Sequence, residues 1–378
     1  MNNQTTKCAL AYHGLSINQD GTLDPCCQYW HHNNSKKIQF TEFSKYQDIL
    51  LQSMYDDFDA GRKHIGCEKC YLDEVAGKSS LRIESNKKFP EYNNEIYDVE
   101  LRLGNLCNLK CIMCSPVASS SISAERYQNV EKFKMIGLYS QPNPENYWES
   151  EEFDSFIQKT LSKVKHINIT GGEPFMIPEV VNILDYLLLN KDTVQISFNT
   201  NLTVLTEKIL ARLQKFKNLE IMISLEGIKE MNEYLRYPSC WDTINSNIEI
   251  LKQKVPMAVL SINHTLQHAS AYSLPALAKF CADKKLTLHL TTIQGWPYMT
   301  LDSVPEKDLI TFQEWTDQTD SIAFHNRVFL KTFIKQAQFN LDNYLKFRAY
   351  IKLLDEIRKT SYDQIFNPSL PIALQKFY

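Results

Sequence analysis

The sequence has no run of about 18 apolar residues, so we expect no membrane-spanning helix. Its first residues, Met-Asn-Asn-Gln-Thr-Thr-Lys-Cys, contain no basic segment followed by an apolar stretch, so we expect no signal peptide. The formal net charge is only −3, because 41 Lys and Arg residues oppose 44 Asp and Glu residues. This balance argues against a protein that coats nucleic acid or a membrane surface.

Cysteine is almost missing after residue 114, where only Cys240 and Cys281 remain of the ten in the chain. A cluster of cysteines near one end is typical of disulfides in small secreted domains, but this chain of 378 residues is neither small nor marked for secretion. We therefore expect a reducing cytoplasm and thiolates that bind metal.

The length predicts two or three domains, since one domain usually holds about 100–200 residues. Apolar residues make up 43% of the chain and aromatic residues 11%, which is enough for a core and excludes disorder for most of it. We expect a cysteine-rich domain over 1–98, an α/β domain over 99–300 and a helical, amphipathic extension over 301–378.

Residues 99 to about 293 alternate between strand and helix patterns. The expected strands are Val99–Leu103, His166–Thr170, Val194–Thr200, Leu219–Leu225, Ala258–His264 and Thr287–Ile293. The expected helices are 121–135, 178–190, 204–216, 241–254, 272–284 and 305–319. Strands that each lead into a helix predict a parallel sheet with right-handed crossovers. Eight such units close a barrel, so six predict a partial (β/α)6 TIM-like barrel with its mouth at the carboxyl ends of the strands.

The first 98 residues have a different pattern. Leu10–Ile17 and Thr22–Leu23 predict a hairpin with a turn at Asp20-Gly21, and a helix is expected over Phe43–Phe58. The polar stretch Ser85–Tyr97 is interpreted as a link to the barrel. A small domain with so little regular core commonly needs a metal.

Cys107, Cys111 and Cys114 lie within eight residues, directly after the first strand of the barrel. Loops at this position form the ligand-binding end of a parallel sheet. A [4Fe–4S] cluster takes four thiolates, so three in one loop hold three irons and leave the fourth open to an added ligand. The alternative is zinc, which prefers four ligands in paired Cys-x2-Cys spacing.

The run Gly171-Gly172-Glu173-Pro174 follows the second strand of the barrel. Two glycines let the backbone approach a ligand closely, and the carboxylate can bind an amine. By itself this run is an ordinary turn signal.

Together the two motifs resemble those of the radical S-adenosylmethionine (radical SAM) enzymes, in the same order and after the same strands. The resemblance implies that Cys107, Cys111 and Cys114 hold a [4Fe–4S] cluster, that S-adenosylmethionine (SAM) chelates its open iron, and that the Gly-Gly-Glu segment binds the amino group of SAM. Softer matches imply further cofactor contacts, each with a plain surface or turn residue as the alternative: Met113, Asn199, Ser224, Glu226 and Arg236. Met113 departs from the family because many members carry an aromatic residue there, and Glu226 stands where Asp is commoner.

Five earlier cysteines form a second set, which resembles the twitch or SPASM module that holds an auxiliary [4Fe–4S] cluster. They are Cys8, Cys26, Cys27, Cys67 and Cys70. We favour Cys8, Cys26, Cys67 and Cys70 as ligands, with Cys27 the spare or an alternative. A structural zinc site is the competing interpretation.

The resemblance implies an enzyme that reductively cleaves SAM to a 5′-deoxyadenosyl radical and abstracts a substrate hydrogen, with reduced flavodoxin or ferredoxin as electron donor. We expect it to oxidise or cross-link a ribosomal peptide; the alternative is a dehydrogenase or epimerase of a carbohydrate or small metabolite. A non-enzyme alternative is an iron–sulfur electron carrier. Cys240, near the barrel mouth, is a weak candidate for a hydrogen donor, whereas Cys281 fits a core position. Nucleic acid is not an expected partner.

Overall fold

The computed structural model describes residues 6–32, 37–75, 79–139, 146–190, 193–293 and 295–366. The chain divides into two compact units. The first unit comprises Met1–Asn105, Pro144–Phe198 and Ala211–Leu219, and the second comprises Leu106–Asn143, Asn199–Leu210 and Glu220–Tyr378. Each is described separately below.

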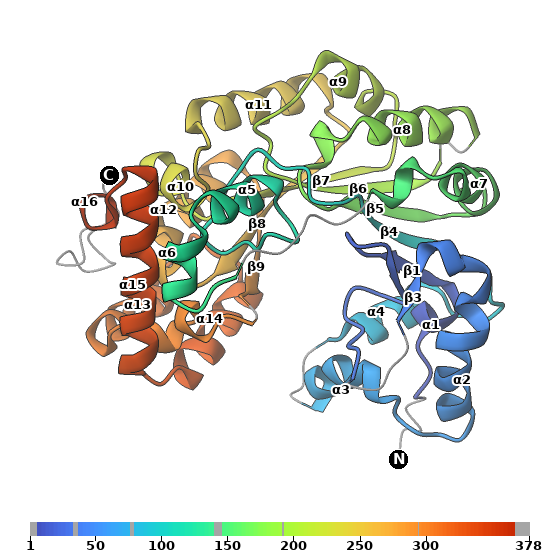
Figure 1. Cartoon of the computed structure of the whole chain (residues 1–378), viewed down its shortest axis with the longest axis horizontal. Helices are drawn as coiled ribbons and strands as arrows, with labels where there is room; N and C mark the ends of the chain where they lie inside the picture. The colour runs from blue at the N-terminus through green and yellow to red at the C-terminus, as the bar shows by residue number, and fades with distance from the viewer. Residues whose placement is uncertain are drawn as a thin grey trace. The chain divides into compact units, whose positions relative to one another are not determined.

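The first unit is built on strands in the order β3-β2-β1-β4-β5-β6 (Figure 1). Their bounds are β1 Gly14–Ile17, β2 Thr22–Asp24, β3 Ile38–Gln39, β4 Asp98–Arg102, β5 His166–Thr170 and β6 Gln195–Thr200. The hairpin β1–β2 is antiparallel, as predicted, but β1 also pairs in parallel with β4, where Leu15 lies opposite Val99. The strands β4, β5 and β6 are parallel to one another. The N-terminal hairpin therefore extends the sheet that carries the first motifs.

The helices of the first unit differ from the prediction at three places. They are α1 Ala9–His13, α2 Gln52–Asp59, α3 Glu68–Val75, α4 Leu81–Lys88, α7 Glu151–Thr160 and α8 Pro178–Asn190, with the short helices η1 Phe40–Lys45, η2 Gln47–Leu51, η3 Ile65–Cys67, η4 Tyr147–Glu149 and η5 Pro174–Met176. Residues 10–13 form α1 and not a strand, and Ser85–Lys88 end α4 and not a linker. The Ser80 hydroxyl caps α4 by accepting from the Ile83 amide at 3.1 Å. The unpredicted α7 is capped in the same way by Ser150 and buries Phe153.

The second unit contains the parallel strands β7 Leu219–Ser224, β8 Val259–Leu266 and β9 Thr287–Thr292. Ile221, Ile262 and Leu288 lie on the buried face of these strands. The helices are α5 Ser120–Gln128, α6 Val130–Met135, α10 Lys229–Leu235, α11 Trp241–Lys254, α12 His268–Lys284, α13 Glu306–Gln318, α14 Phe324–Gln336, α15 Leu341–Arg358 and α16 Tyr362–Phe366, with the short helices η6 Pro297–Met299 and η7 Leu301–Ser303. The last four helices, orange to red in Figure 1, form the expected helical C-terminal region.

The fold class is confirmed: parallel strands alternate with helices in an α/β arrangement, and the six predicted strands are present within two residues of their expected ends. Helix α9 (Glu207–Leu213) has residues in both units. Residues 367–378, which end the expected C-terminal extension, lie outside the described part of the chain. Among the helices that the structure describes, none is long and apolar enough to cross a membrane.

A close backbone approach fixes the end of β5. The φ of Gly171 is +127°, and a Cβ at this position lies only 2.9 Å from the Leu103 backbone nitrogen and 3.0 Å from the Gly104 carbonyl oxygen. The Leu103 amide donates to the Thr170 carbonyl at 3.1 Å, so the two chains cannot separate without losing this bond. Glycine is required here because both the conformation and the space exclude a side chain.

We expect Gly171→Ala to lower the free energy of unfolding by about 2–4 kcal/mol, since it adds backbone strain to a steric clash. The matched control is Gly61→Ala, because Gly61 has a φ of +68° and no atom of the described residues within 4 Å of the added Cβ. In the control, the free energy of unfolding should fall by only about 1 kcal/mol, because alanine is strained in the left-handed conformation. Urea denaturation measures both, and equal losses would contradict the close approach at Gly171.

Candidate functional site

The three cysteines of the first motif lie together in the loop that follows β4. Cys111 is buried, and Cys107 and Cys114 are half-buried. The Cys114 amide donates to the Cys111 carbonyl at 3.0 Å, which makes a tight turn between the two. The Cys107 sulfur accepts from the Leu109 amide at 3.5 Å and from the Asn201 side-chain amide at 3.9 Å. Donors to sulfur favour the thiolate, the form that binds metal.

One charged side chain beside this loop, that of Arg236, favours anionic sulfur against the effect of burial. Burial raises the pKa of Cys111 and Cys114 above the ordinary thiol value, and the Arg236 guanidinium opposes the rise at both. The thiols of Cys114 and Cys107 raise the pKa of Cys111 further, so the three groups are close enough to interact. A cation beside them compensates part of the charge that three thiolates bring.

Arg236 is held at the cysteine loop by the backbone on either side of it. The Lys110 amide donates to the Tyr237 carbonyl at 2.6 Å, and the Ile112 amide donates to the Leu235 carbonyl at 3.0 Å. Arg236 Nη1 then reaches the Cys111 sulfur at 3.7 Å. The loop and the segment after α10 therefore form a short two-chain ladder with Arg236 at its centre.

Arg236 also forms a bidentate ion pair with Glu226, which follows β7 closely. Arg236 Nη2 donates to Glu226 Oε1 at 3.1 Å, and Nε donates to Oε2. The Glu226 side chain is fully buried, and its Oε1 accepts from the Thr265 amide at 3.3 Å. The two residues that the sequence singled out separately thus share one charge-neutral pair beside Cys111.

Three further predicted cofactor contacts lie in the second unit: Asn199, Ser224 and Met113. Asn199 stands near the end of β6, and its Oδ1 is buried with no hydrogen-bond partner among the described residues. Ser224 ends β7 and is half-buried, as is Met113 in the turn between Cys111 and Cys114. An unpartnered buried oxygen such as that of Asn199 is a place where a ligand donor fits.

Sequence reasoning missed two residues beside Ser224. In the register of β7, β8 and β9, Ser224 lies opposite Asn263, and Asn263 lies opposite His289. Register partners of parallel strands point to the same face, so the three half-buried polar side chains form a row. The signal was present as polar residues at alternate positions of apolar strands, but it needed the register to align them.

The Gly-Gly-Glu-Pro run lies in the first unit, against the residues that directly follow β4. The Gly172 amide donates to the Gly104 carbonyl at 3.1 Å. Glu173 is fully buried, and its Oε1 accepts from the Phe175 amide at 3.2 Å at the start of η5, whose first residue is Pro174. A buried carboxylate at the carboxyl end of a parallel strand is well placed to take a cationic group.

The N-terminal cysteine thiols influence one another electrostatically. Cys8 and Cys70 are buried, Cys26 and Cys67 are half-buried, and Cys27 is exposed. Burial is the largest cause that raises the pKa of Cys26 and of Cys67; the Cys27 thiol comes next at Cys26, and the Cys8 thiol also raises both. Burial raises the pKa of Cys8 to about 11, and the Cys70 thiol adds to this rise.

Cys27 lies beside Cys26 but also has charged neighbours on the sheet. Part of the residue reaches solvent, yet the protein around its thiol raises the pKa to about 12, and its strongest charged neighbours are Glu100 and Arg102. These two residues belong to β4, so the Cys27 thiol faces the sheet.

The remaining cysteines lie apart from these groups. Cys240 is exposed at the start of α11, where the Thr243 backbone amide lowers the pKa of its thiol, and Cys281 is buried within α12. In the described part of the chain, no three His, Cys, Asp or Glu side chains converge closely enough to hold a single metal ion.

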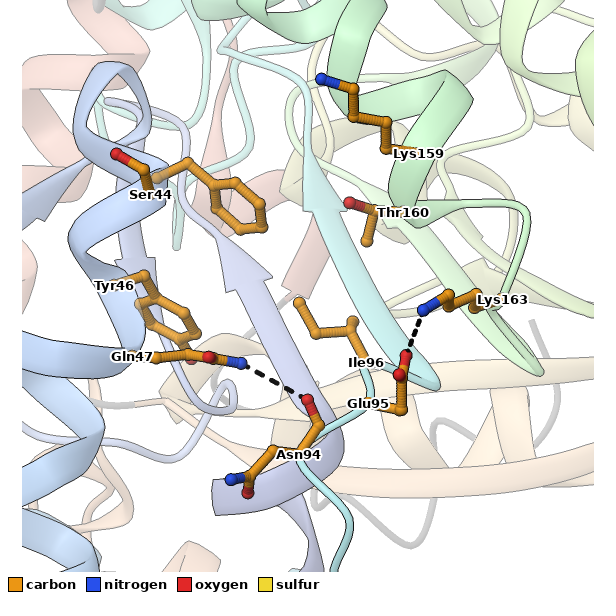
Figure 2. Close-up of a pocket in the computed structure, with 10 residues that line it drawn as sticks. Ser44, Tyr46, Gln47, Asn94, Glu95, Ile96, Lys159, Thr160 and Lys163 are labelled. Carbon is orange, nitrogen blue, oxygen red and sulfur yellow. Dashed lines mark hydrogen bonds and ion pairs between the residues drawn. The ribbon is translucent and has the colours of Figure 1, made fainter.

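A cavity of about 290 Å³ in the first unit lies at the other end of the strands (Figure 2). Ile96, just before β4, and Lys163, just before β5, line it. Lys163 is paired with Glu95 at 2.7 Å, and Gln47 donates to the Asn94 carbonyl at 3.4 Å. This cavity is therefore separate from the motif residues that follow the strands of this unit.

Comparison with curated proteins finds relatives of low identity. A probable GTP 3′,8-cyclase from Methanococcus maripaludis is 24% identical over 197 residues, which cover 50% of this chain and 57% of that protein. A GTP 3′,8-cyclase from Desulforamulus reducens is 23% identical over 186 residues, covering 48% of this chain and 51% of the relative. The chain thus spans only about half the length of these relatives.

Solved structures show weaker likeness. The structure titled "Native anSMEcpe with bound AdoMet" matches with 14% identity and a TM-score of 0.39, covering 65% of this chain and 63% of that one. Streptococcus suis SuiB bound to precursor peptide SuiA matches with 14% identity and a TM-score of 0.39, covering 86% and 70%.

The family comparison is more direct. The model of the Radical SAM superfamily matches residues 101–268, which include the cysteine loop, the Gly-Gly-Glu-Pro run and the Glu226–Arg236 pair. Members of this superfamily are enzymes that use a [4Fe–4S] cluster and SAM. The match identifies residues 101–268 as a radical SAM domain.

Proposed function

We propose that this protein is a radical SAM enzyme whose Cys107, Cys111 and Cys114 hold a [4Fe–4S] cluster with one open iron. The observation that carries the proposal is the cysteine loop, in which three interacting thiols lie beside the Arg236 guanidinium. The donor set fits such a cluster, because three thiolates leave one iron for an outside ligand. An electron carrier, in contrast, closes its coordination with a fourth thiolate.

When bound, the cluster and SAM supply a 5′-deoxyadenosyl radical that takes a hydrogen atom from the substrate. The chain's own residues orient the partners and exclude water. Glu173 offers a buried carboxylate to the amino group of SAM, and the unpartnered Oδ1 of Asn199 accepts a further donor. Gly171 and Gly172 let the backbone approach SAM closely. Met113 and Ser224 supply further contacts to SAM. Glu226 holds Arg236 in place at the cysteine loop.

The cysteines of residues 1–98 form, in this proposal, an auxiliary [4Fe–4S] module of the twitch or SPASM type. Supporting it are the influences among these thiols: Cys70 raises the pKa of Cys8, Cys8 and Cys70 raise the pKa of Cys67, and Cys27, Cys8 and Cys67 raise the pKa of Cys26. Cys27 is the spare thiol because its strongest charged neighbours are on β4. A closed second cluster exchanges electrons with the substrate or relays them inward.

The substrate we propose first is a ribosomal peptide that is oxidised or cross-linked, and second a carbohydrate or small metabolite. The row of Ser224, Asn263 and His289 offers hydrogen-bonding groups to either class. The curated relatives are named for a reaction on GTP, which makes GTP the third compound to test. Incubating the reduced enzyme and SAM with each class, and following substrate consumption by mass spectrometry, separates them; reduced flavodoxin or ferredoxin is the proposed electron source.

The proposal predicts that the wild-type protein, reconstituted without oxygen, holds about eight irons per chain and forms 5′-deoxyadenosine from SAM under a strong reductant. A variant with Cys107, Cys111 and Cys114 all changed to Ala should hold about four irons and form none. Cys240→Ala is the control for iron content, since this exposed thiol lies outside both cysteine sets. Bound zinc without any 5′-deoxyadenosine would replace the proposal with a zinc-stabilised binding protein.

Arg236→Lys should slow 5′-deoxyadenosine formation by about ten- to a hundredfold, because an ammonium cannot make the bidentate pair and reach the Cys111 sulfur together. The matched control is Arg348→Lys in α15, where a bidentate pair with Asp363 is about half exposed at the carboxylate. Exposed pairs contribute little, so this control should behave like wild type. Equal rates for the two variants would show that Arg236 has no special role.

Cys67→Ala should lose about four irons, whereas Cys27→Ala should keep all of them, because Cys67 interacts with both Cys8 and Cys70, while the strongest charged neighbours of the Cys27 thiol are Glu100 and Arg102. Iron and sulfide analysis of both reconstituted variants checks this. Loss of iron from Cys27→Ala alone would exchange the roles of the two residues.

A further inference from the structure

Helix α15, for which the sequence offered no motif, presents one buried stripe to the rest of the second unit. Tyr350, Leu354 and Arg358 follow one another at four-residue spacing, so they share one side of the helix. All three are buried, with exposed fractions of 4%, 1% and 9%. A charged and a hydroxylated side chain in such a stripe need partners, and these partners belong to the surroundings of the cysteine loop.

Tyr350 contacts the loop itself. Its hydroxyl donates to the carbonyl oxygen of Ile112 at 2.9 Å, and Ile112 lies inside the turn between Cys111 and Cys114. The amide of Ile112 is bonded on the other side to the Leu235 carbonyl. Both backbone groups of this residue are therefore fixed, one by the ladder that carries Arg236 and the other by α15.

A buried ion pair attaches α15 to the helix that follows the cysteine loop. The Arg358 guanidinium donates to both carboxylate oxygens of Glu125 in α5, at 2.8 and 3.1 Å, and neither side chain is more than 4% exposed. The Glu125 carboxylate also forms an ion pair with Lys110 of the cysteine loop, with 3.4 Å between Oε1 and Nζ. Because removing either partner leaves a buried charge, this pair holds α15 firmly in place.

A second hydrogen bond attaches α15 to helix α10, which precedes Arg236. Tyr234 in α10 donates to Asp355 Oδ1 at 2.9 Å. Tyr234 stands two residues before Arg236, so α15 is bonded both to the cysteine loop and to the segment paired with it. The Arg358 guanidinium, at 5.3 Å from the Tyr237 ring centroid, covers the same segment.

From these contacts we propose that α15 is a wall of the cluster site and that Tyr350 is a positioning residue for the Cys111–Cys114 turn. The inference rests on the proposed function, because it assumes that the loop holds the cluster. Without the Tyr350 hydroxyl, the buried Ile112 carbonyl loses its donor, and the turn must open toward water or shift to find another. Either movement displaces the two sulfurs and exposes the site.

The test uses the full-length, reconstituted protein and the variant Tyr350→Phe, which removes only the hydroxyl. Two properties of the cluster are followed: the rate at which a chelator removes iron, and the change that SAM causes in the electron paramagnetic resonance spectrum of the reduced protein. Only a cluster with an open iron responds to SAM, so the second readout isolates the cysteine loop from any closed cluster. We expect iron loss from the SAM-responsive cluster to become about tenfold faster.

Two other tyrosines provide matched controls. Tyr298 has its ring centroid 5.7 Å from that of Tyr350, but its buried hydroxyl has no hydrogen-bond partner within the described part of the chain. Tyr298→Phe should therefore leave both readouts as in wild type. Tyr272 donates to Asp308 at 2.7 Å between α12 and α13, so Tyr272→Phe removes a buried hydrogen bond elsewhere in the unit. It should lower the melting temperature without changing the SAM-dependent spectrum.

The outcomes separate the two proposals. Faster iron loss and an altered SAM-dependent spectrum in Tyr350→Phe alone support the role of α15. If Tyr350→Phe matches wild type, or if Tyr272→Phe loses iron equally fast, the positioning role is overturned while the proposed function stands. If wild-type protein shows no SAM-responsive cluster at all, the proposed function fails and the inference fails with it.

Discussion

The site depends on the buried pair between Arg236 and Glu226. Burial disfavours anionic sulfur at Cys111 and Cys114, and a fixed cation nearby opposes this effect. Arg236 supplies that cation at Cys111, but an unpaired guanidinium in the interior is itself unfavourable. Glu226 resolves this by pairing with two nitrogens of Arg236 while its own Oε1 accepts from the Thr265 amide. This ion pair therefore connects three segments: the end of β7, the strand β8 and the cysteine loop.

A helix of the C-terminal region, α15, supplies a second buried ion pair beside the cysteine loop. Arg358 and Glu125 form a second buried pair, and Lys110 of the loop shares the Glu125 carboxylate. Between the two pairs, the turn that carries Cys111 and Cys114 is bonded on one side to Leu235 and on the other to Tyr350. Helix α15, which carries no recognisable motif, thus contributes hydrogen-bonding and ion-pair partners to the cysteine loop and the helix that follows it.

Local patterns predicted the fold where the signals were strong and local. The strand His166–Thr170 has the expected bounds, because alternating apolar residues end at a glycine pair. The helix α7 was missed because its pattern lies among polar residues, and its start depends on the Ser150 cap and on burial of Phe153 against the rest of the unit. Residues 10–13 were expected to extend the hairpin strand, but they belong to a short helix that begins at Ala9. Such short elements follow tertiary contacts more than intrinsic preference.

The residue types and their spacing predict the chemistry proposed for the site: the three cysteines, the Gly-Gly-Glu-Pro run after the next strand, and a second set of cysteines near the N-terminus. The first two are local features, since one loop supplies each motif. Which distant residues contact these motifs follows from strand register and helix packing. The pairing of Arg236 with Glu226, the row of Asn263 and His289 beside Ser224, and the bond from Tyr350 to Ile112 join residues through strand register and helix packing. Residues far apart in the chain have no common sequence signal, because their contact is created by the fold.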